Sequence, residues 1–373
     1  MPQIKLAIDG CGDLCRRTIL PHLALADARS CSKVVAVCDA VGDRARAVAE
    51  RFDVPQWYGD YTGMLAAEDI DAVLVVVPAA LHAAHAIEAV RSGRHVYVQK
   101  PIATDVRDAR ALIAEAKTHG VKIVAAPGQI LWPLFTRLRE RIQEGAIGQP
   151  FFAQPPMLGW GGEKVSFPTN PAWFFGPDCG PLRDHGGYAI HTLTTLFGPV
   201  RRVSAFAGVA ARTREWNGQK FEVARHDNAA VLLDFGGSLF ALIADAWCAT
   251  SPAASILRVH GLEGVIETDA RWAGQNAILP LAYTVHRHNA TPVTFTLDPQ
   301  EVSFLQGGHL DLPNPHVYGD ILHLIDCIAE NREPLATAKH ALHTVEVIDA
   351  TLRSAETGQV QNVSGDSSDL PLQ

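Results

Sequence analysis

The opening of the chain constrains its fold most strongly, because two apolar runs frame a glycine turn and the second run ends in an acidic residue. Ile4 to Asp9 forms the first run and leads directly into Gly10-Cys11-Gly12-Asp13-Leu14-Cys15. Val34 to Cys38 forms the second run and ends at Asp39. A strand, a glycine turn, a helix and a second strand with an acidic end are typical of a dinucleotide-binding α/β fold. The sequence therefore predicts a parallel sheet that binds a dinucleotide outside the carboxyl ends of its strands.

The glycine turn predicts how the dinucleotide would be held. Gly10 permits the tight turn, and Gly12 lets the backbone approach the pyrophosphate. The first amides of the following helix, at Asp13 and Leu14, would donate hydrogen bonds to that anion. Cys15 occupies the third small position of the pattern, where its sulfur is larger than glycine or alanine. We expect an imperfect but tolerable packing of the helix on the strand there.

Asp39 favours NAD as the cofactor over NADP. A carboxylate at the end of the second strand can accept hydrogen bonds from the adenosine ribose hydroxyls, and it repels a 2′-phosphate. Ala40 and Val41, which follow it, supply no cation to offset that repulsion. The spacing from the turn is a little longer than usual, and we expect a loop over Asp27 to Ser32 to absorb the difference. The alternative is that Asp39 is an ordinary surface turn residue.

A length of 373 residues favours two domains. Up to residue 127, short apolar runs alternate with helical patterns, as in a parallel sheet covered on both faces. We therefore expect a Rossmann dinucleotide-binding domain over residues 1–127. Its other predicted elements are helices at Leu14–Ala26, which Pro21 is expected to kink or shorten, Gly42–Phe52, Ala80–Arg91 and Val106–Thr118, and strands at Asp71–Val77, His95–Val98 and Val121–Ala125.

Residues 128–373 have a different pattern and are expected to form an α+β domain for substrate binding and oligomerisation. Longer segments alternate aliphatic and polar residues, which indicates a large, mainly antiparallel open sheet with one face on helices. The other face is left to solvent or to a partner subunit, so a homodimer or homotetramer is expected. The predicted elements are strands at Arg202–Val209, Asn228–Leu233, Ser238–Ala246 and Ile256–His260, and helices at Tyr318–Glu330 and Ala341–Glu356.

Composition narrows the class of partner. A formal net charge of −8, without a run of basic residues along one helix, argues against nucleic acid and favours a small-molecule substrate. No apolar stretch approaches the roughly 20 residues that a membrane span needs, and the first residues do not resemble a targeting segment. Seven scattered cysteines indicate reduced thiols and a cytoplasmic protein. The histidines lack carboxylates or cysteines at ligand spacing, so no metal site is predicted.

Lys100 is the strongest candidate for chemistry in the first domain. It follows the strand-like run His95-Val96-Tyr97-Val98-Gln99 and is followed at once by Pro101. Because ligands bind outside the carboxyl ends of the strands in such sheets, a lysine at a strand end belongs beside the cofactor. Pro101 disfavours the α region for Lys100, which keeps the backbone of the lysine extended. The alternative is a solvated surface charge.

A second group of candidates, Asp184, Tyr188 and His191, lies in the segment from Gly180 to Phe197. If this segment is helical, spacings of four and three residues put the three side chains on one face. Oxidation of an alcohol requires a group that takes the hydroxyl proton, and lysine, tyrosine or histidine can do this. His191 is explained equally well as a histidine that packs in a helix interface.

These motifs together resemble the glucose–fructose oxidoreductase, inositol dehydrogenase and rhizopine-catabolism family of nicotinamide-dependent oxidoreductases, over nearly the whole chain. The resemblance implies that Lys100 is the catalytic lysine and that Asp184 and Tyr188 line the substrate site. The matching motifs, in order, are Gly10-x-Gly12, the Pro78 turn, His95 to Pro101, Glu144 to Gly148 and Asp184-x-Gly186-x-Tyr188. The cofactor contacts that the resemblance implies include Pro78, His82, Gln99 and Lys100.

Two positions depart from the pattern of that family. Gln99 stands where the family usually has glutamate, which removes a negative charge that would hold Lys100 protonated. The lysine would then act more easily as a base near neutral pH. Tyr188 stands where many dehydrogenases of the family have histidine, and a phenol near a lysine can relay its proton.

The sequence predicts an NAD-dependent oxidoreductase that transfers a hydride between the nicotinamide and a secondary alcohol of a sugar, glycoside or cyclitol. Two alternatives remain. One is a redox-assisted glycoside hydrolase or lyase that uses bound NAD transiently. The other is a non-catalytic NAD- and sugar-binding regulatory protein of the same fold. Gln99 keeps the last alternative open, whereas Lys100 and Tyr188 argue against it.

Overall fold

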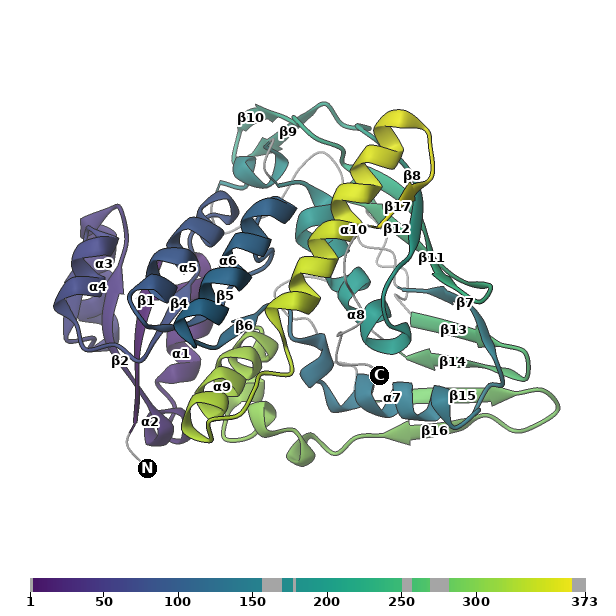
Figure 1. Cartoon of the computed structure of the whole chain (residues 1–373), viewed down its shortest axis with the longest axis horizontal. Helices are drawn as coiled ribbons and strands as arrows, with labels where there is room; N and C mark the ends of the chain where they lie inside the picture. Colours follow the sequence, from purple (N-terminus) through teal and green to yellow (C-terminus); the bar gives the residue numbers. More distant parts are fainter. Residues whose placement is uncertain (1–2, 156–169, 177–178, 250–256, 269–281, 364–373) are drawn as a thin grey trace. The chain divides into compact units, whose positions relative to one another are not determined.

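The structure of the protein is a computed structural model that describes residues 3–155, 170–176, 179–249, 257–268 and 282–363. The chain divides into two compact units (Figure 1). The first unit contains Met1–Leu131 and Val302–Leu342, and the second contains Trp132–Glu301 and His343–Gln373. The first segment of the first unit ends at Leu131, close to the expected domain boundary at residue 127. The expectation that residues 128–373 form one domain needs correction, because Val302–Leu342 returns to the first unit.

A six-stranded parallel sheet of order β3-β2-β1-β4-β5-β6 forms the centre of the first unit. The chain runs from β1 outward to β3 on one side and from β4 outward to β6 on the other, so the strand order reverses between β1 and β4. Ligands of open α/β sheets bind at such a reversal, outside the carboxyl ends of the strands. The strands are β1 Ile4–Asp9, β2 Ser32–Cys38, β3 Gln56–Tyr58, β4 Ala72–Val75, β5 His95–Val98 and β6 Ile123–Ala125.

Helices connect these strands, and several begin or end at residues suited to capping. The Asp60 and Asp105 carboxylates accept hydrogen bonds from the amides of Gly63 and Asp108, at 2.7 and 2.9 Å. Gly120 ends its helix with a left-handed φ of 64°. The helical segments are η1 Cys15–Ile19, α1 Leu20–Leu23, α2 Ala26–Cys31, α3 Gly42–Phe52, α4 Tyr61–Ala67, η2 Ala79–Leu81, α5 His82–Arg91, α6 Val106–His119, η3 Gln129–Leu131, η8 Ser303–Leu305, η9 His309–Asp311 and α9 Pro315–Ala329.

The helix after the glycine turn differs from the expected span Leu14–Ala26. The segment η1 consists of π-helical turns, and α1 is a single turn. The expected loop over Asp27 to Ser32 instead contains most of α2 and the first residue of β2. Pro21 explains the irregularity, because it cannot donate the amide hydrogen that would bond to the carbonyl four residues earlier.

The helix α9 explains why a late segment of the sequence belongs to the first unit. It packs on β1, β5 and β6 and on η1, and its apolar residues Ile321 and Leu324 are fully buried. The Asp320 carboxylate on α9 accepts a hydrogen bond from the Gly128 amide at 3.1 Å. An apolar sheet face must be covered by another element. Here the covering helix comes from near the end of the chain (Figure 1).

A nine-stranded sheet of order β16-β15-β14-β13-β7-β12-β11-β8-β17 forms the second unit, together with the hairpin β9–β10. All neighbouring strands of the large sheet are antiparallel except β7 and β12, which are parallel. The expected first residue of one strand, Ile256, lies outside the described residues. The strands are β7 Pro150–Gln154, β8 Arg202–Gly208, β9 Thr213–Trp216, β10 Gln219–Glu222, β11 Asn228–Gly236, β12 Leu239–Ala246, β13 Leu257–Gly261, β14 Gly264–Thr268, β15 Ala282–Arg287, β16 Val293–Thr296 and β17 Gln361–Asn362.

Burial alternates along the central strands of this sheet. On β11, Val231 and Leu233 are buried while Ala230 and Leu232 are exposed. The predicted fold class, a Rossmann domain and an α+β unit with a large, mainly antiparallel sheet, is confirmed. The helices outside the first unit are α7 Pro133–Gln143, η4 Ala172–Phe175, η5 Leu182–Gly186, α8 Gly187–Phe197, η7 Pro299–Glu301 and α10 Ala338–Thr357, which is shared by both units.

Candidate functional site

The glycine turn has the geometry that a bound dinucleotide requires. Gly10 has a φ of 104°, and a Cβ added there would lie 2.7 Å from the Val76 carbonyl oxygen. No other residue fits this position, because both the backbone angle and the neighbouring strand exclude a side chain. A Cβ added at Gly12 would meet no atom within 4 Å among the described residues. Gly12 therefore exposes its backbone to open space, where a pyrophosphate could approach.

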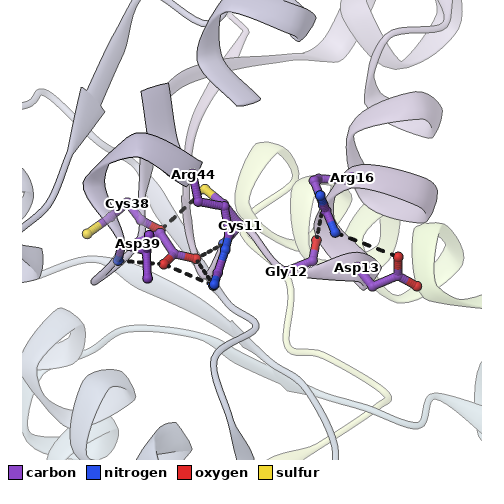
Figure 2. A network of polar contacts seen from close by, with 8 residues as sticks. Cys11, Gly12, Asp13, Arg16, Cys38, Asp39 and Arg44 are labelled. Carbon is purple, nitrogen blue, oxygen red and sulfur yellow. Dashed lines mark hydrogen bonds and ion pairs between the residues drawn. The ribbon is translucent and has the colours of Figure 1, made fainter. Parts of the chain in front are cut away.

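The helical segment after this turn begins at Asp13, directly after Gly12. The first helical hydrogen bond runs from the Arg16 amide to the Gly12 carbonyl at 3.2 Å. The amides ahead of Arg16, including those of Asp13 and Leu14, have no acceptor within the helix and are suited to an anion. The Asp13 carboxylate lies 3.9 Å from Arg16 Nη2 (Figure 2). It also lies 3.5 Å from Arg17 Nη1, and the two cations offset its charge.

Asp39 lies at the centre of a hydrogen-bond network that joins the end of β2 to the glycine turn. Figure 2 shows its Oδ2 accepting from the Cys11 amide at 2.9 Å. Its Oδ1 accepts from the Val41 amide at 2.8 Å, and Arg44 Nη1 lies 3.2 and 3.1 Å from the two oxygens. Asp39 is buried, which argues against an ordinary surface turn residue. It would therefore support the turn as well as bind a ribose.

Arg44 corrects one step of the sequence argument. Ala40 and Val41 supply no cation near Asp39, but Arg44 does, from the first turn of α3. The signal was present in the sequence, because the first turn of a helix that follows a strand lies beside the end of that strand. A 2′-phosphate at this place would meet a carboxylate and a guanidinium together, so we expect both residues to influence the preference for NAD.

A second polar pair, the buried Asp9 and the half-buried His85, lies beside the glycine turn. Asp9 ends β1, and its Oδ2 is 2.6 Å from His85 Nδ1 on α5. Burial raises the pKa of Asp9, while the hydrogen bond to Asp9 raises the pKa of His85. Tyr61 stacks on the imidazole with ring centroids 4.7 Å apart. The pair fastens α5 to β1, a role that the sequence analysis did not assign.

Gln99 turns its side chain back toward its own strand. Its Oε1 accepts a hydrogen bond from the Lys100 amide at 3.1 Å, so the amide nitrogen Nε2 is the atom that donates to Tyr97 Oη at 2.7 Å. Both Gln99 and Tyr97 are buried. A glutamate in this position would need the tyrosine hydroxyl to donate instead. Gln99 thus helps to fix the backbone of Lys100, which is itself half-buried.

Two other residues that the resemblance assigned to the cofactor have different surroundings. Pro78 is exposed and precedes η2. His82 is only 2% exposed, and its ring nitrogens lie 2.7 Å from the Pro101 carbonyl oxygen and 2.8 Å from that of Val77. Both ring nitrogens therefore face backbone carbonyl oxygens of the protein.

The second group of candidates lies on η5 and α8 in the second unit. Asp184 is buried in η5, with His185 Nε2 3.5 Å from its Oδ2. Hydrogen bonds in π-helical turns span five residues, so the predicted alignment of Asp184 with Tyr188 over four residues does not follow from α-helical geometry. Tyr188 and His191 both belong to α8, and their spacing of three keeps them on neighbouring parts of one face.

His191 differs from the half-buried Tyr188 in being completely buried. Burial lowers the pKa of His191 to about 3, and the nearby His343 adds to the effect. The imidazole is neutral at neutral pH and has no access to water from its own position. The burial of His191 favours the interpretation that it packs in a helix interface over the interpretation that it carries the substrate proton.

Asp245 is a buried acid that the sequence analysis missed. It lies on β12 among the inward-facing positions Ala241 and Ile243, and a Cβ added at Gly186 would be 3.5 Å from its Oδ2. Burial raises the pKa of Asp245 well above its usual range, and the charge of Asp184 adds to the shift. Both effects favour the protonated form of Asp245. An acidic residue at an apolar position of an alternating strand was the available signal.

The candidate residues thus form two groups, each described within its own unit. Gly10, Gly12, Asp39 and Lys100 all lie at the carboxyl edge of the parallel sheet. The described residues contain no group of three or more histidines, cysteines or acids that could hold a metal ion. In the same part of the chain, no helix is long and apolar enough to cross a membrane.

Comparisons with known proteins agree with this arrangement. Residues 4–126 match the family model described as an oxidoreductase family with an NAD-binding Rossmann fold, and residues 135–267 match the Gfo/Idh/MocA C-terminal domain. D-apiose dehydrogenase from Paraburkholderia graminis is 24% identical over 99% of this chain and 92% of its own length.

Two further proteins illustrate the range of the similarity. The NAD-dependent scyllo-inositol 2-dehydrogenase of Bacillus subtilis is 29% identical over 32% of this chain and 35% of its own length. The solved structure of levoglucosan dehydrogenase with NADH and levoglucosan has a TM-score of 0.81, covering 98% of this chain and all of that chain at 19% identity. At that identity the structural likeness establishes the fold alone.

Proposed function

Because this chain belongs to the Gfo/Idh/MocA family of oxidoreductases, whose first domain is an NAD-binding Rossmann fold, we propose that it is a sugar or cyclitol dehydrogenase. Its substrate would carry a secondary alcohol on a sugar, glycoside or cyclitol. The observation that carries the proposal is the position of Lys100, directly after β5, at the edge of the sheet that also carries the glycine turn. The sugar and cyclitol substrates named for the relatives support the same class.

The residues of the first unit fit NAD. Gly12 leaves room for the pyrophosphate, the amides of Asp13 and Leu14 would bind it, and Asp39 would bind the ribose. NAD held there would supply the acceptor for the hydride that leaves the alcohol carbon. The Lys100 amine takes the proton of the same hydroxyl, so that alcohol and lysine become ketone and ammonium. Asp184 and Tyr188 are proposed to bind and orient the substrate.

The test compares Lys100→Met with Lys122→Met on a panel of sugars and cyclitols with NAD. Lys122 precedes β6 at the opposite edge of the same sheet and pairs with Glu333 at 3.4 Å, which makes it a matched control. We expect Lys100→Met to lose about 10²–10⁴-fold in turnover, because a general base is removed. NAD affinity, measured by calorimetry, should stay within about threefold.

Three results would change the proposal. Near-wild-type turnover of Lys100→Met would remove the lysine from the mechanism. Substrate conversion without net NADH would favour the redox-assisted hydrolase or lyase. Absence of turnover on every substrate, with NAD bound, would favour the regulatory protein.

We further propose that the protein is a homodimer or homotetramer that associates through the open face of its large sheet. Phe206 on β8 is 80% exposed, and Leu232 on β11 and Phe240 on β12 are also exposed on that face. The register puts Phe206 beside Ala230 and Leu232 beside Leu242. A broad apolar strand face of this kind is a liability in a monomer.

A further inference from the structure

The imidazole of His82 joins two loops at the carboxyl edge of the parallel sheet. Its Nδ1 lies 2.7 Å from the Pro101 carbonyl oxygen, and its Nε2 lies 2.8 Å from the Val77 carbonyl oxygen. Val77 follows β4 and Pro101 follows β5, and these two strands are neighbours in the sheet. His82 itself is the first residue of α5. One buried ring therefore connects both loops to the start of a helix.

The Pro101 contact bears on Lys100, because Pro101 follows the lysine directly and its ring restricts the backbone between the lysine and the bonded carbonyl. The Gln99 Oε1 accepts the Lys100 amide hydrogen on one side of the lysine. His82 bonds the carbonyl of Pro101 on the other side. The backbone of Lys100 is thus restrained before and after its Cα by two buried side chains. Such restraint fixes the direction in which the side chain leaves the sheet.

The protonation of His82 decides which of its two contacts is a hydrogen bond. A carbonyl oxygen only accepts, so both contacts at once would need a doubly protonated ring. Burial lowers the pKa of His82 and outweighs the contacts with the Pro101 and Val77 carbonyls, which raise it; the positive charges of Lys100 and His85 lower it further. The ring is therefore neutral at neutral pH and carries one proton. The shorter contact, from Nδ1 to Pro101, is the one that we assign to it.

We propose that His82 is a positioning residue for Lys100, acting through a hydrogen bond from Nδ1 to the Pro101 carbonyl. This rests on the proposed function, in which Lys100 exchanges the substrate proton. A base displaced by about 1 Å can lose on the order of 10²-fold in rate, even when the cofactor is bound normally. The imidazole touches neither substrate nor cofactor in this assignment.

The experiment uses the different reach of two amide side chains. Asparagine can put its amide nitrogen near the position of Nδ1, whereas glutamine reaches the position of Nε2. We expect His82→Asn to keep turnover within about threefold of wild type and His82→Gln to lose about 10- to 100-fold, with the Michaelis constants little changed. The affinity for NAD, from calorimetry, should be the same for both variants. Equal turnover of the two variants, or a better His82→Gln, would overturn the assignment.

His85→Asn is the matched control, because His85 lies on the same helix and bonds Asp9 instead of the lysine loop. Thermal melting of all variants identifies general loss of stability. A second readout needs no turnover: ¹³C reductive methylation of Lys100 in the cofactor-free protein gives an NMR signal that reports its surroundings. We expect this signal to move in His82→Gln and to stay in His82→Asn and His85→Asn. An unchanged signal in His82→Gln would contradict the positioning role.

A double substitution separates this proposal from the proposed function. In a Lys100→Met background, His82→Gln should cause no further loss of residual turnover, because the residue that it positions is absent. If His82→Gln lowered the residual turnover of Lys100→Met as much as it lowers wild-type turnover, His82 would have a role independent of the lysine. High turnover of Lys100→Met alone would contradict the proposed function, and the methylation signal would still decide whether His82 positions Lys100.

Discussion

The Asp39 carboxylate accepts more hydrogen bonds within the protein than a residue that only binds a ribose would need. Two backbone amides and the Arg44 guanidinium already surround its carboxylate. A carboxylate has about four lone-pair sites, so Arg44 has to give way before both ribose hydroxyls can donate to Asp39. The side chain of Arg44 is 46% exposed and can move. We therefore expect the pair, rather than the acid alone, to set the cofactor preference.

We predict that the unmodified protein prefers NAD and that Asp39→Ser changes the ratio of the two affinities by about tenfold or more in favour of NADP. The substitution removes the repulsion of the 2′-phosphate and releases Arg44 to bind it. Adding Arg44→Ala should abolish most of that gain. Calorimetric titration of both cofactors decides the matter, with Arg46→Ala as control because Arg46 pairs with Asp43 on the same helix. Tighter binding of NADP by the unmodified protein would contradict the prediction.

Between elements, the contact of Asp9 with His85 is the clearest example of a polar group that fixes a helix on the sheet. β1 and α5 are 76 residues apart at this contact, yet the two side chains are 2.6 Å apart. Because the pKa of His85 is raised from 6.5, its contribution to stability is complete below about pH 6.5. That contribution is lost as the pH rises through the higher value in the folded protein.

We predict that the melting temperature of the wild-type protein exceeds that of His85→Asn most at about pH 6, and that the difference shrinks toward about pH 9. The raised pKa of Asp9 has its own effect at lower pH: the folded protein binds that proton more tightly, so stability falls as Asp9 ionises. A difference that stays constant from pH 6 to pH 9 would mean that the charge of His85 does not stabilise the contact.

Much of the first unit could be predicted from the sequence because its signals are local. β1 ends where predicted, and the glycine turn follows from residues adjacent in the chain. The π-helical turns at Cys15 and at Asp184 could not be predicted, since they depend on how the preceding turns pack. The contacts of Asp245 and Arg44 were also missed, although each had a sequence signal. The return of α9 to the first sheet depends on contacts across nearly 200 residues, such as that of Gly128 with Asp320.

At the scale of the whole molecule, the open face of the large sheet is the feature with the greatest consequence. Along each central strand, exposed residues on this face alternate with residues buried in the core of the second unit. The same strand therefore contributes to both the open face and the core. Phe206, Leu232 and Phe240 lie on three neighbouring strands. Arg202 and Asp234 form an ion pair at the same end of β8 and β11. The face is apolar in its middle and polar at this edge.

We predict that Phe206→Asp weakens self-association at least about tenfold, because it puts a charge into an apolar interface. Sedimentation velocity at several concentrations measures the effect. Leu262→Asp is the control, since Leu262 is 72% exposed in the turn between β13 and β14 and away from the centre of the face. A wild-type protein that is a monomer at micromolar concentration would contradict the proposed association.

The return of Val302–Leu342 to the first unit also determines when that unit can fold during translation. The ribosome makes on the order of 5–20 residues per second, so tens of seconds can separate synthesis of β6 from that of α9. During this interval the faces of β5 and β6 that α9 will cover lie open to chaperones and proteases. Most of the second unit is synthesised within the same interval. The nucleotide-binding half, first in the sequence, is therefore completed only after most of the second unit has left the ribosome.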